Sequence, residues 1–451
     1  MRTARRRRTG AAAALVSAAL LLTAAGCGGS DSDGGGSSDA SSSSCKPAGK
    51  KVTLTFTSWV PGMQETVDLW NKDNPDIQVD YKEVVGGNQG TYQAYSNQIK
   101  AGKTPDIGMI EFDNLPSFRL QDGLQNVGGC QPVKDVESKY VDWAISQVGF
   151  GEKGAVYGIP MDIGPMALYY RKDLFEQAGI APPATWDDYY AAAQKIKAQG
   201  ATIGDFPTDQ PAWFTSLAWQ NGAKWFSVDD DTWTVSLTDD PTKQVADYWQ
   251  KLIDEKVVDT IPGLGDPQWK ALDSGKEWSI IGAAWTTKLL ESSAPKTKGK
   301  WAVAPMPQWT AGTNTAGNWG GSTAVVFKNS KYPYEASKFA TWAFSNLDAL
   351  ALNNKNGGQY PATTEGQEQL PALTEGLPYY GDQKVWEVFA QASAGVDPSF
   401  QWGPTMTDTY AALADGIGKA VNGQGTLNDA LTTAQDKTIE TMKSQTLTVA
   451  D

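Results

Sequence analysis

The stretch YGIPMDIGPMALYYRKDLF, residues 157–175, predicts where the chain passes from one sheet to another, and the fold depends on this passage. Two apolar runs, 156–160 and 166–170, have the length and β-branched or aromatic content of strands. The short segment 161–164 joins them and is typical of a crossover between sheets. A helix over 173–178 follows, and Gly179 ends it. We therefore expect the chain to leave one sheet and enter a second one here.

Strands and helices alternate on both sides of this stretch. Strands are expected at 52–57, 77–81 and 107–110, with a polar helix over 92–101. Further on, strands are expected at 301–307 and 322–327. Thr185 and Asp188 form a capping box that opens one helix, Asp240-Pro241 opens another, and Thr426 caps the last one. This alternation predicts an α/β fold with a mainly parallel sheet and helices on its faces.

The composition excludes several kinds of chemistry. The 451 residues include 38 Lys plus Arg, 51 Asp plus Glu and no histidine, which gives a formal charge of 38 − 51 = −13. Without histidine there is no Ser-His-Asp or Cys-His mechanism and no imidazole metal site. The acidic balance argues against binding nucleic acid, which requires clustered basic residues. The 18 Trp, 16 Tyr and 13 Phe are unusual in a polar chain and call for a reason.

The N-terminus has the pattern of an export signal. Residues 1–26 combine a basic start, with five arginines, and a short apolar run over 11–25. The run ends at Thr23-Ala-Ala-Gly-Cys27, which resembles the lipobox of bacterial lipoproteins, so we expect Cys27 to be lipidated; ordinary cleavage is the alternative. Residues 27–49 would then form a flexible Gly/Ser tether on the outer face of the cell membrane. Removing residues 1–26 changes the charge to 33 − 51 = −18.

Two further cysteines remain, Cys45 and Cys130. In an oxidising exported compartment they are candidates for one disulfide, and two free thiols are the alternative.

An ordered set of motifs along the mature chain resembles one family. The set comprises 102–107 (GKTPDI), 157–160, 170–175 (YRKDLF), 178–180, 185–188 (TWDD), 274–276, 282–285 (GAAW) and 320–322. In this order they resemble the extracellular solute-binding proteins of carbohydrate ABC importers, the branch that includes maltose-binding protein. The resemblance implies the type II, two-lobed periplasmic-binding-protein fold. The N-lobe would be 50–161 with 316–362, and the C-lobe 162–315 with 363–451.

By the same resemblance, the protein is a monomeric, non-enzymatic receptor that needs no cofactor or metal. It would hold a sugar, an oligosaccharide by our reading, in the cleft between the lobes and deliver it to the permease subunits of an ABC transporter. A lipid anchor would keep it extracytoplasmic, and no nucleic acid would be involved.

A sugar offers hydroxyl groups and a flat apolar face, so its site needs aromatic rings beside hydrogen-bonding side chains. The residues that match the family's ligand positions, or follow the ends of predicted strands, are Trp59, Gln64, Glu111, Asp113, Asp162, Gln210, Trp213, Trp285, Trp319, Gly320, Gly321 and Trp402. Trp285 corresponds to the main stacking tryptophan of the family. Gln210 replaces the glutamate of maltose-binding protein, which argues against maltose as the ligand. For Trp59 and Asp113 the alternative is a solvated loop, and for Trp285 it is simple packing.

Other tryptophans and motifs have plainer interpretations. Trp70, Trp186, Trp249 and Trp342 lie at helical spacing among apolar residues and are expected in the core. Gly102-Lys-Thr104 imitates the end of a P-loop, but Asn97 stands where its first glycine belongs. Residues 229–231, three aspartates, lack the glycine and closing glutamate of a calcium loop and predict a polar hairpin.

One enzyme class stays open as an alternative. A secreted glycoside hydrolase needs only two carboxylates and no histidine. With 51 acidic residues, the presence of candidate pairs does not discriminate between the two functions.

Overall fold

The computed structural model describes residues 45–229, 231–374 and 377–450. The predicted signal peptide, the lipidation of Cys27 and the tether up to residue 44 lie outside the described residues.

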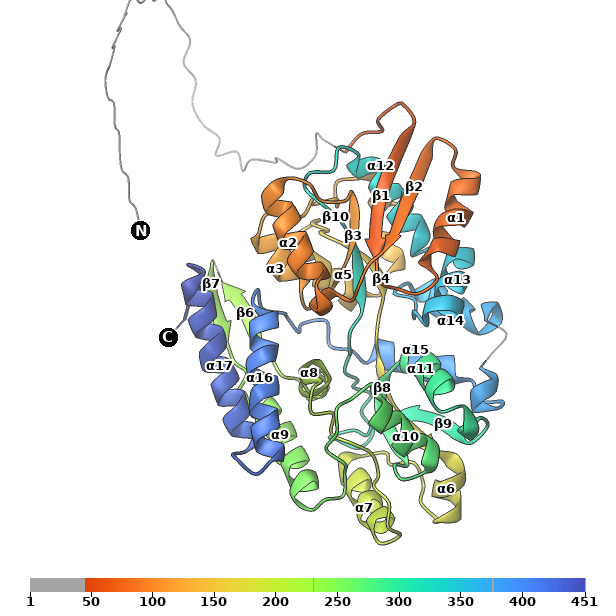
Figure 1. Ribbon diagram of the computed structural model, residues 1–451, viewed down its shortest axis with the longest axis vertical. Coiled ribbons are helices and arrows are strands. Elements are labelled where there is room, and N and C mark those ends of the chain that lie inside the picture. Colours follow the sequence, from red (N-terminus) through yellow and green to blue (C-terminus); the bar gives the residue numbers. More distant parts are fainter. Residues whose placement is uncertain (1–44, 230, 375–376, 451) are drawn as a thin grey trace, which may run out of the picture. The chain divides into compact units, whose positions relative to one another are not determined.

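The first lobe is built on a five-stranded sheet (Figure 1). Its strands, in spatial order, are β2 (Ile77–Glu83), β1 (Val52–Ser58), β3 (Ile107–Glu111), β10 (Ser322–Val326) and β4 (Ile159–Asp162). The predicted strands are therefore present. Alternate residues of β1 are buried, as expected for a strand with one face on the core.

The second lobe contains two small sheets. One has the order β8 (Ser279–Ala283), β5 (Met166–Arg171), β9 (Trp301–Pro305), and the other has the order β11 (Thr448–Val449), β7 (Thr232–Val235), β6 (Phe226–Asp229). The crossover predicted at 161–164 is confirmed, because β4 belongs to the first lobe's sheet and β5 to the second lobe's. The predicted polar hairpin is formed by β6 and β7.

The prediction of a mainly parallel sheet holds only for the first lobe, where β2, β1, β3 and β4 run in one direction and β10 runs against them. β1 pairs in parallel with β2 and β3, but β10 runs antiparallel to β3 and β4, and β5 runs antiparallel to β8 and β9. The reason is the direction in which the chain enters each lobe. β10 and β5 begin at the junction of the lobes, whereas their neighbours end there, so the neighbours must run the opposite way.

Seventeen α-helices surround these sheets in the described part of the chain. Those before β5 are α1 (Met63–Asp73), α2 (Thr91–Ala101), α3 (Leu115–Leu120), α4 (Gln131–Lys134) and α5 (Asp142–Gly149). Those between β5 and β10 are α6 (Lys172–Gln177), α7 (Trp186–Lys197), α8 (Pro211–Gln220), α9 (Asp240–Asp254), α10 (Asp266–Ser274) and α11 (Thr286–Ser293). After β10 come α12 (Pro333–Ala343), α13 (Leu347–Gly357), α14 (Thr364–Leu373), α15 (Val385–Ala394), α16 (Met406–Val421) and α17 (Leu427–Ser444).

The predicted helix ends are confirmed in detail. Thr185 and Thr426 each form a complete capping box, the first with Asp188 and the second with Asp429. Gly179 follows α6 with φ of 64°, a left-handed conformation that glycine adopts without strain. None of the helices in the described ranges has the length and apolar content needed to cross a membrane.

Much of the aromatic content packs inside the lobes. Trp70, Trp186 and Trp249 are buried as predicted. Trp342 is only half-buried, with its ring centroid 5.2 Å from that of Trp70. These rings meet in tilted or edge-to-face pairs, the geometry that aromatic quadrupoles favour.

The disulfide between Cys45 and Cys130 is present, with the two Cα atoms 5.2 Å apart. It closes a loop across 85 residues that contains β1, β2 and β3.

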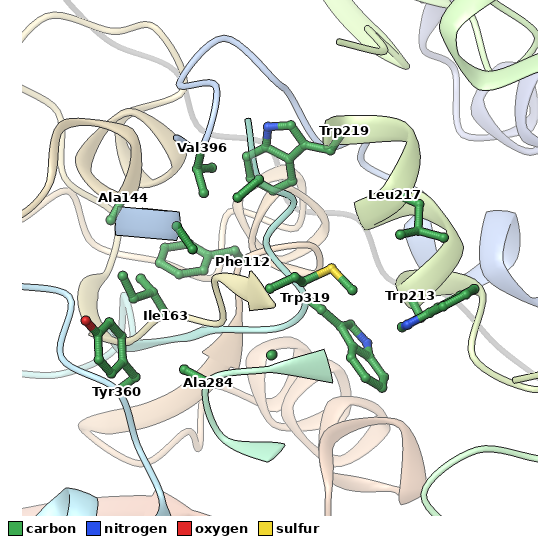
Figure 2. Packing of buried hydrophobic residues seen from close by; sticks show 14 of the residues in the cluster. Phe112, Ala144, Ile163, Trp213, Leu217, Trp219, Ala284, Trp319, Tyr360 and Val396 are labelled. Atoms are coloured by element: carbon green, nitrogen blue, oxygen red, sulfur yellow. The ribbon is translucent and has the colours of Figure 1, made fainter. Parts of the chain in front are cut away.

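Three chain segments cross between the lobes side by side. Ile163 pairs with Tyr360, and Pro165 pairs with Asn318. The backbone N–H of Trp319 donates to the carbonyl of Gly164 at 2.8 Å. Figure 2 shows Phe112, Ile163, Trp319 and Tyr360 packed around this junction, with Trp213, Leu217 and Trp219 along α8. The exact residues at which the lobes divide stay a prediction.

A buried acidic group lies in the second lobe. Glu277, just before β8, has no exposed surface, and neither carboxyl oxygen has a hydrogen-bond partner within the described ranges. Burial raises the pKa of Glu277 to about 10, and the neighbouring Asp205 and Asp259 add to the shift. Lys276 opposes it but donates its own hydrogen bond to Asp259 at 2.6 Å. Glu277 therefore keeps its proton in the folded protein near neutral pH.

This proton predicts a pH dependence of stability. An unfolded glutamate ionises near pH 4.5, whereas folded Glu277 stays protonated, so the folded state binds the extra proton and loses stability as pH rises. One such proton lowers the free energy of unfolding by about 2 kcal/mol between pH 5.5 and 7. Glu277→Gln should remove that part of the slope, as measured by urea unfolding at several pH values. Glu387→Gln on the exposed side of α15 is the control, and equal slopes for all three proteins would contradict the prediction.

Candidate functional site

Two predicted acidic residues are brought together by the register of the first lobe's sheet. Ser322, the first residue of β10, pairs with Glu111 at the end of β3 and with Asp162 at the end of β4. Residues paired directly across strands point to the same face of a sheet. Both carboxyl groups therefore lie at the edge of the sheet where the chain passes to the second lobe.

Aromatic residues border these acids. The Tyr92 hydroxyl on α2 donates to Glu111 Oε2 at 2.9 Å and accepts from the Glu111 backbone N–H at 3.1 Å. Trp59, which follows β1, is half-buried, and its ring meets Tyr92 edge-to-face with centroids 5.7 Å apart. The Trp59 ring thus packs on the Tyr92 ring, and the Tyr92 hydroxyl contacts the Glu111 carboxyl group.

The environment favours the protonated forms of these acids. Burial raises the pKa of Glu111 to about 8, and Asp113 and Asp162 add to the shift by like-charge repulsion. Burial also raises the pKa of Asp162 to about 6 and raises the pKa of Asp113. The Asn114 amide partly offsets the last shift by donating to Asp113 Oδ1 at 2.8 Å. Taking carboxylates out of water and placing them together disfavours their charge.

Several polar groups around these acids lack partners. Asp162 is 8 % exposed, and its Oδ1 has no hydrogen bond among the described residues. Neither amide atom of Gln359, which is 4 % exposed, has a hydrogen bond of normal geometry among the described residues, although the amide lies close enough to Asp162 to lower the pKa of that carboxyl. The hydroxyl of Tyr410 on α16, which is 9 % exposed, likewise lacks one of normal geometry but lies close enough to Asp113 to lower the pKa of that carboxyl. Buried polar groups are normally hydrogen-bonded, so this set points to an external ligand.

A pair of indole rings lies at the junction, with Trp285 from the second lobe and Trp319 from the crossing segment before β10. Trp285, just before α11, is half-buried and donates from Nε1 to the carbonyl of Trp319 at 3.0 Å. The two ring centroids are 4.7 Å apart. Gly320 and Gly321 follow with φ of 77° and 93°. A Cβ on Gly321 would lie 3.0 Å from the Phe112 ring and 3.1 Å from the Asp162 carbonyl, so glycine lets this segment pass close to both.

The two lobes also touch beside the acids. Thr407 Oγ1 on α16 donates to Asn114 Oδ1 at 3.0 Å. Asn114, three residues after the end of β3, is buried. The site is therefore formed by residues of both lobes.

The prediction that Trp213 faces the ligand is wrong. Its side chain is 2 % exposed, its Nε1 donates to the Ile281 carbonyl at 2.9 Å, and its ring centroid lies 5.0 Å from that of Trp249. Trp213 is in the first turn of α8, and its side chain turns inward to the second lobe's core rather than toward the acids.

Three other predicted residues are not joined to the acids by any contact among the described residues. Gln64 is exposed and donates to Asp68 along α1 at 2.8 Å. Gln210, the N-cap of α8, is half-buried and donates to Asp209 at 3.3 Å. Trp402 packs on Trp219 and lines a groove of about 880 Å³. Their roles as ligand contacts stay predictions.

Sequence reasoning missed four residues of the site: Tyr92, Asn114, Gln359 and Tyr410. Asn114 directly follows the predicted pair at 111 and 113, so the same strand-end signal pointed to it. The other three come from helices or from a crossing segment, and only the folded chain brings them to the acids.

The arrangement suits an uncharged, polyhydroxylated molecule. The acids and amides can accept and donate hydrogen bonds to hydroxyl groups, and the indole pair offers an apolar surface for a ring. Within the described ranges, no group of three or more acidic or cysteine side chains is arranged to hold a metal ion.

Known proteins show the same architecture and a clear family relationship. The family model for bacterial extracellular solute-binding proteins matches residues 55–349. The lactose-binding protein of Rhizobium radiobacter is 25 % identical over 399 residues, 84 % of this chain and 90 % of that protein. The arabinooligosaccharide-binding protein of Bacillus subtilis (strain 168) is 26 % identical over 311 residues, 66 % of this chain and 71 % of that one.

A solved structure resembles this chain in both shape and sequence. It is the galacto-N-biose/lacto-N-biose I-binding protein of the ABC transporter from Bifidobacterium longum, bound to lacto-N-biose. It aligns with a TM-score of 0.79 at 28 % identity and covers 89 % of this chain and 100 % of its own. The predicted two-lobed α/β fold of the maltose-binding-protein type is thereby confirmed.

Proposed function

This chain belongs to the bacterial extracellular solute-binding protein family, and from that premise we propose that it captures an oligosaccharide between its lobes and delivers it to an ABC permease. The observation that carries the proposal is the pairing of Ser322 with both Glu111 and Asp162, three residues after the Trp319 ring that contacts Trp285. Relatives and solved neighbours are binding proteins for arabinooligosaccharides, lactose and lacto-N-biose, which supports a sugar as the ligand.

Delivery requires that the ligand favour one arrangement of the lobes. Residues of both lobes surround the unpartnered polar groups, so a sugar that bonds to all of them binds best when the lobes are together. The crossing segments, which pair antiparallel at Ile163, Pro165 and Asn318, are suited to hinge motion. The permease subunits would then distinguish loaded from empty protein by its shape.

The protein acts without chemical turnover under this proposal. The relatives named above are binding proteins, which gives the hydrolase alternative no support. Incubating the purified protein with lactose, lacto-N-biose and arabinooligosaccharides should release no products. Hydrolysis of any of them would overturn this part of the proposal.

Isothermal titration tests the function directly. We expect stoichiometric binding of at least one of lactose, lacto-N-biose, β-1,6-galactobiose and arabinooligosaccharides. Amino acids and polyamines serve as the comparison set. If these bind and no sugar does, the carbohydrate assignment fails.

Trp285→Ala should weaken sugar binding by about 5- to 150-fold, or about 1 to 3 kcal/mol, through the loss of an aromatic anchor. The half-buried ring supports this, because its removal leaves the cores of both lobes in place. Trp285→Phe keeps a ring and should lose less affinity. Trp233→Ala, another half-buried tryptophan in the β6–β7 hairpin, is the matched control. Unchanged affinity with a large fall in melting temperature would show that Trp285 is a packing residue.

We also propose a lipid anchor at Cys27 that holds the protein on the outer face of the cell membrane. The support is the sequence pattern, a basic and apolar leader followed directly by this cysteine. Cys27→Ser should release the protein into the medium, as measured by fractionation of cells. Retention in the membrane fraction would contradict the anchor.

A further inference from the structure

We infer that this site selects uncharged glycans and rejects sugar acids and sugar phosphates, with Glu111, Asp113 and Asp162 as the specificity-determining residues. The inference rests on the proposed function and specifies the class of sugar.

The three acids act as one electrostatic unit. Ser322 pairs with Glu111 on one side and Asp162 on the other, and Asp113 follows Glu111 by two residues. Asp113 and Asp162 both repel charge on Glu111. A ligand that bonds to one of these carboxyl groups is therefore within the field of all three.

Among the described residues, no basic side chain forms an ion pair with them. None of the ion pairs between described residues includes Glu111, Asp113 or Asp162. Lys288 on α11 lies beside Gly358, the residue before Gln359. Its ammonium group, however, pairs with Glu291 at 3.2 Å. Recognition of a carboxylate or phosphate normally uses arginine or lysine, so an anionic sugar would meet like charge here at a pH at which these acids are ionised.

The unpartnered groups indicate which ligand chemistry fits. Asp162 Oδ1, both amide atoms of Gln359 and the Tyr410 hydroxyl are all more than nine-tenths buried and have no hydrogen bond of normal geometry among the described residues. Together they offer acceptors and donors that match neutral hydroxyl groups, which can both donate and accept. A carboxylate or phosphate accepts only, so it would leave Asp162 unsatisfied and add repulsion.

The test compares a carboxylate sugar with a neutral molecule of the same shape. The probes are lactose, lacto-N-biose and β-1,6-galactobiose, each with C6 of the terminal galactose converted to a carboxylate or to a carboxamide. The carboxamide has nearly the same shape without the charge. By isothermal titration at pH 8, we expect the carboxylate to bind on the order of 100-fold more weakly than the carboxamide.

Two changes should reduce the difference in affinity between the carboxylate and the carboxamide if the acids cause that difference. At pH 5 the site acids gain protons while an ordinary sugar carboxylate stays ionised, so the carboxylate-to-carboxamide ratio should fall toward 10-fold or less. Glu111→Gln should narrow the ratio at pH 8 by about tenfold. Asp113→Asn provides a second variant in case the first disturbs folding, which circular dichroism and thermal melting would show.

The outcomes separate this inference from the proposed function. If the carboxylate binds within threefold of the carboxamide at pH 8, the inference is overturned and the sugar-binding function stands. A large gap that neither pH 5 nor either variant narrows would also overturn it, because the acids would not be the cause. If none of the neutral parent sugars or their carboxamides binds, the proposed function fails for these sugars, and the inference fails with it.

Discussion

Gly164→Ala is expected to destabilise the folded protein by about 3 kcal/mol and to weaken sugar binding at the same time. A Cβ on Gly164 would lie 2.0 Å from the Trp319 carbonyl oxygen and 3.1 Å from Trp285 Nε1. The obstacle at 2.0 Å is backbone, which cannot rotate away as a flexible side chain can. Gly164 also accepts the hydrogen bond from the Trp319 N–H, so the added methyl group must push two crossing segments apart.

A second glycine provides the control. Gly418 on α16 has ordinary helical φ, and a Cβ there would meet nothing within 4 Å. Gly418→Ala should be neutral or stabilising by up to about 1 kcal/mol, because alanine favours the helix. Urea unfolding and titration of a bound sugar give the two readouts. If Gly164→Ala behaves like Gly418→Ala in both, the close contact between the crossing segments does not matter for stability or binding.

Removing the Cys45–Cys130 disulfide should lower the free energy of unfolding by about 4 kcal/mol. The bond closes a loop across 85 residues that holds three of the first lobe's five strands, so breaking it enlarges the unfolded ensemble considerably. The double variant Cys45→Ser/Cys130→Ser avoids leaving one unpaired thiol in the core, where Cys130 is buried.

Chemical unfolding of both proteins, with and without a thiol reductant, measures this effect. The reductant should destabilise the natural protein and leave the double variant unchanged. The contradicting result is a purely local effect. In that case only the segment before β1 would fray, with faster hydrogen exchange at residues 46–51, and global unfolding would be unaltered. That result would show that the disulfide ties down a terminus instead of stabilising the lobe.

The strand ends explain why the first lobe's acids were predictable. Glu111 and Asp113 follow a short apolar run that is buried in the structure, and residues directly after a strand lie at the sheet edge whatever the rest of the fold is. Ligand sites of α/β proteins favour that edge. The same local logic identified the capping boxes at Thr185 and Thr426, because capping depends on residues three apart.

Trp213 shows where such reasoning stops. It stands in the first turn of a helix whose N-terminus was expected at the ligand, and seven of the next residues on α8 are also buried. Because α8 is apolar on all sides, its sequence cannot say which side chains face the core and which face the junction. The position of Trp249 and the Ile281 carbonyl decides that.

By itself, the sequence determined the type and order of the elements, the crossover at residues 161–164, the family and the acids at the strand ends. These follow from short-range periodicity, turn residues and motif order, all of which are local along the chain. The tertiary structure alone decided the mixed direction of the sheets and the approach of Tyr92, Gln359 and Tyr410 to Glu111, Asp113 and Asp162. Those contacts depend on how three crossing segments bring distant stretches together, and pairing over such separations leaves no periodic trace in the sequence.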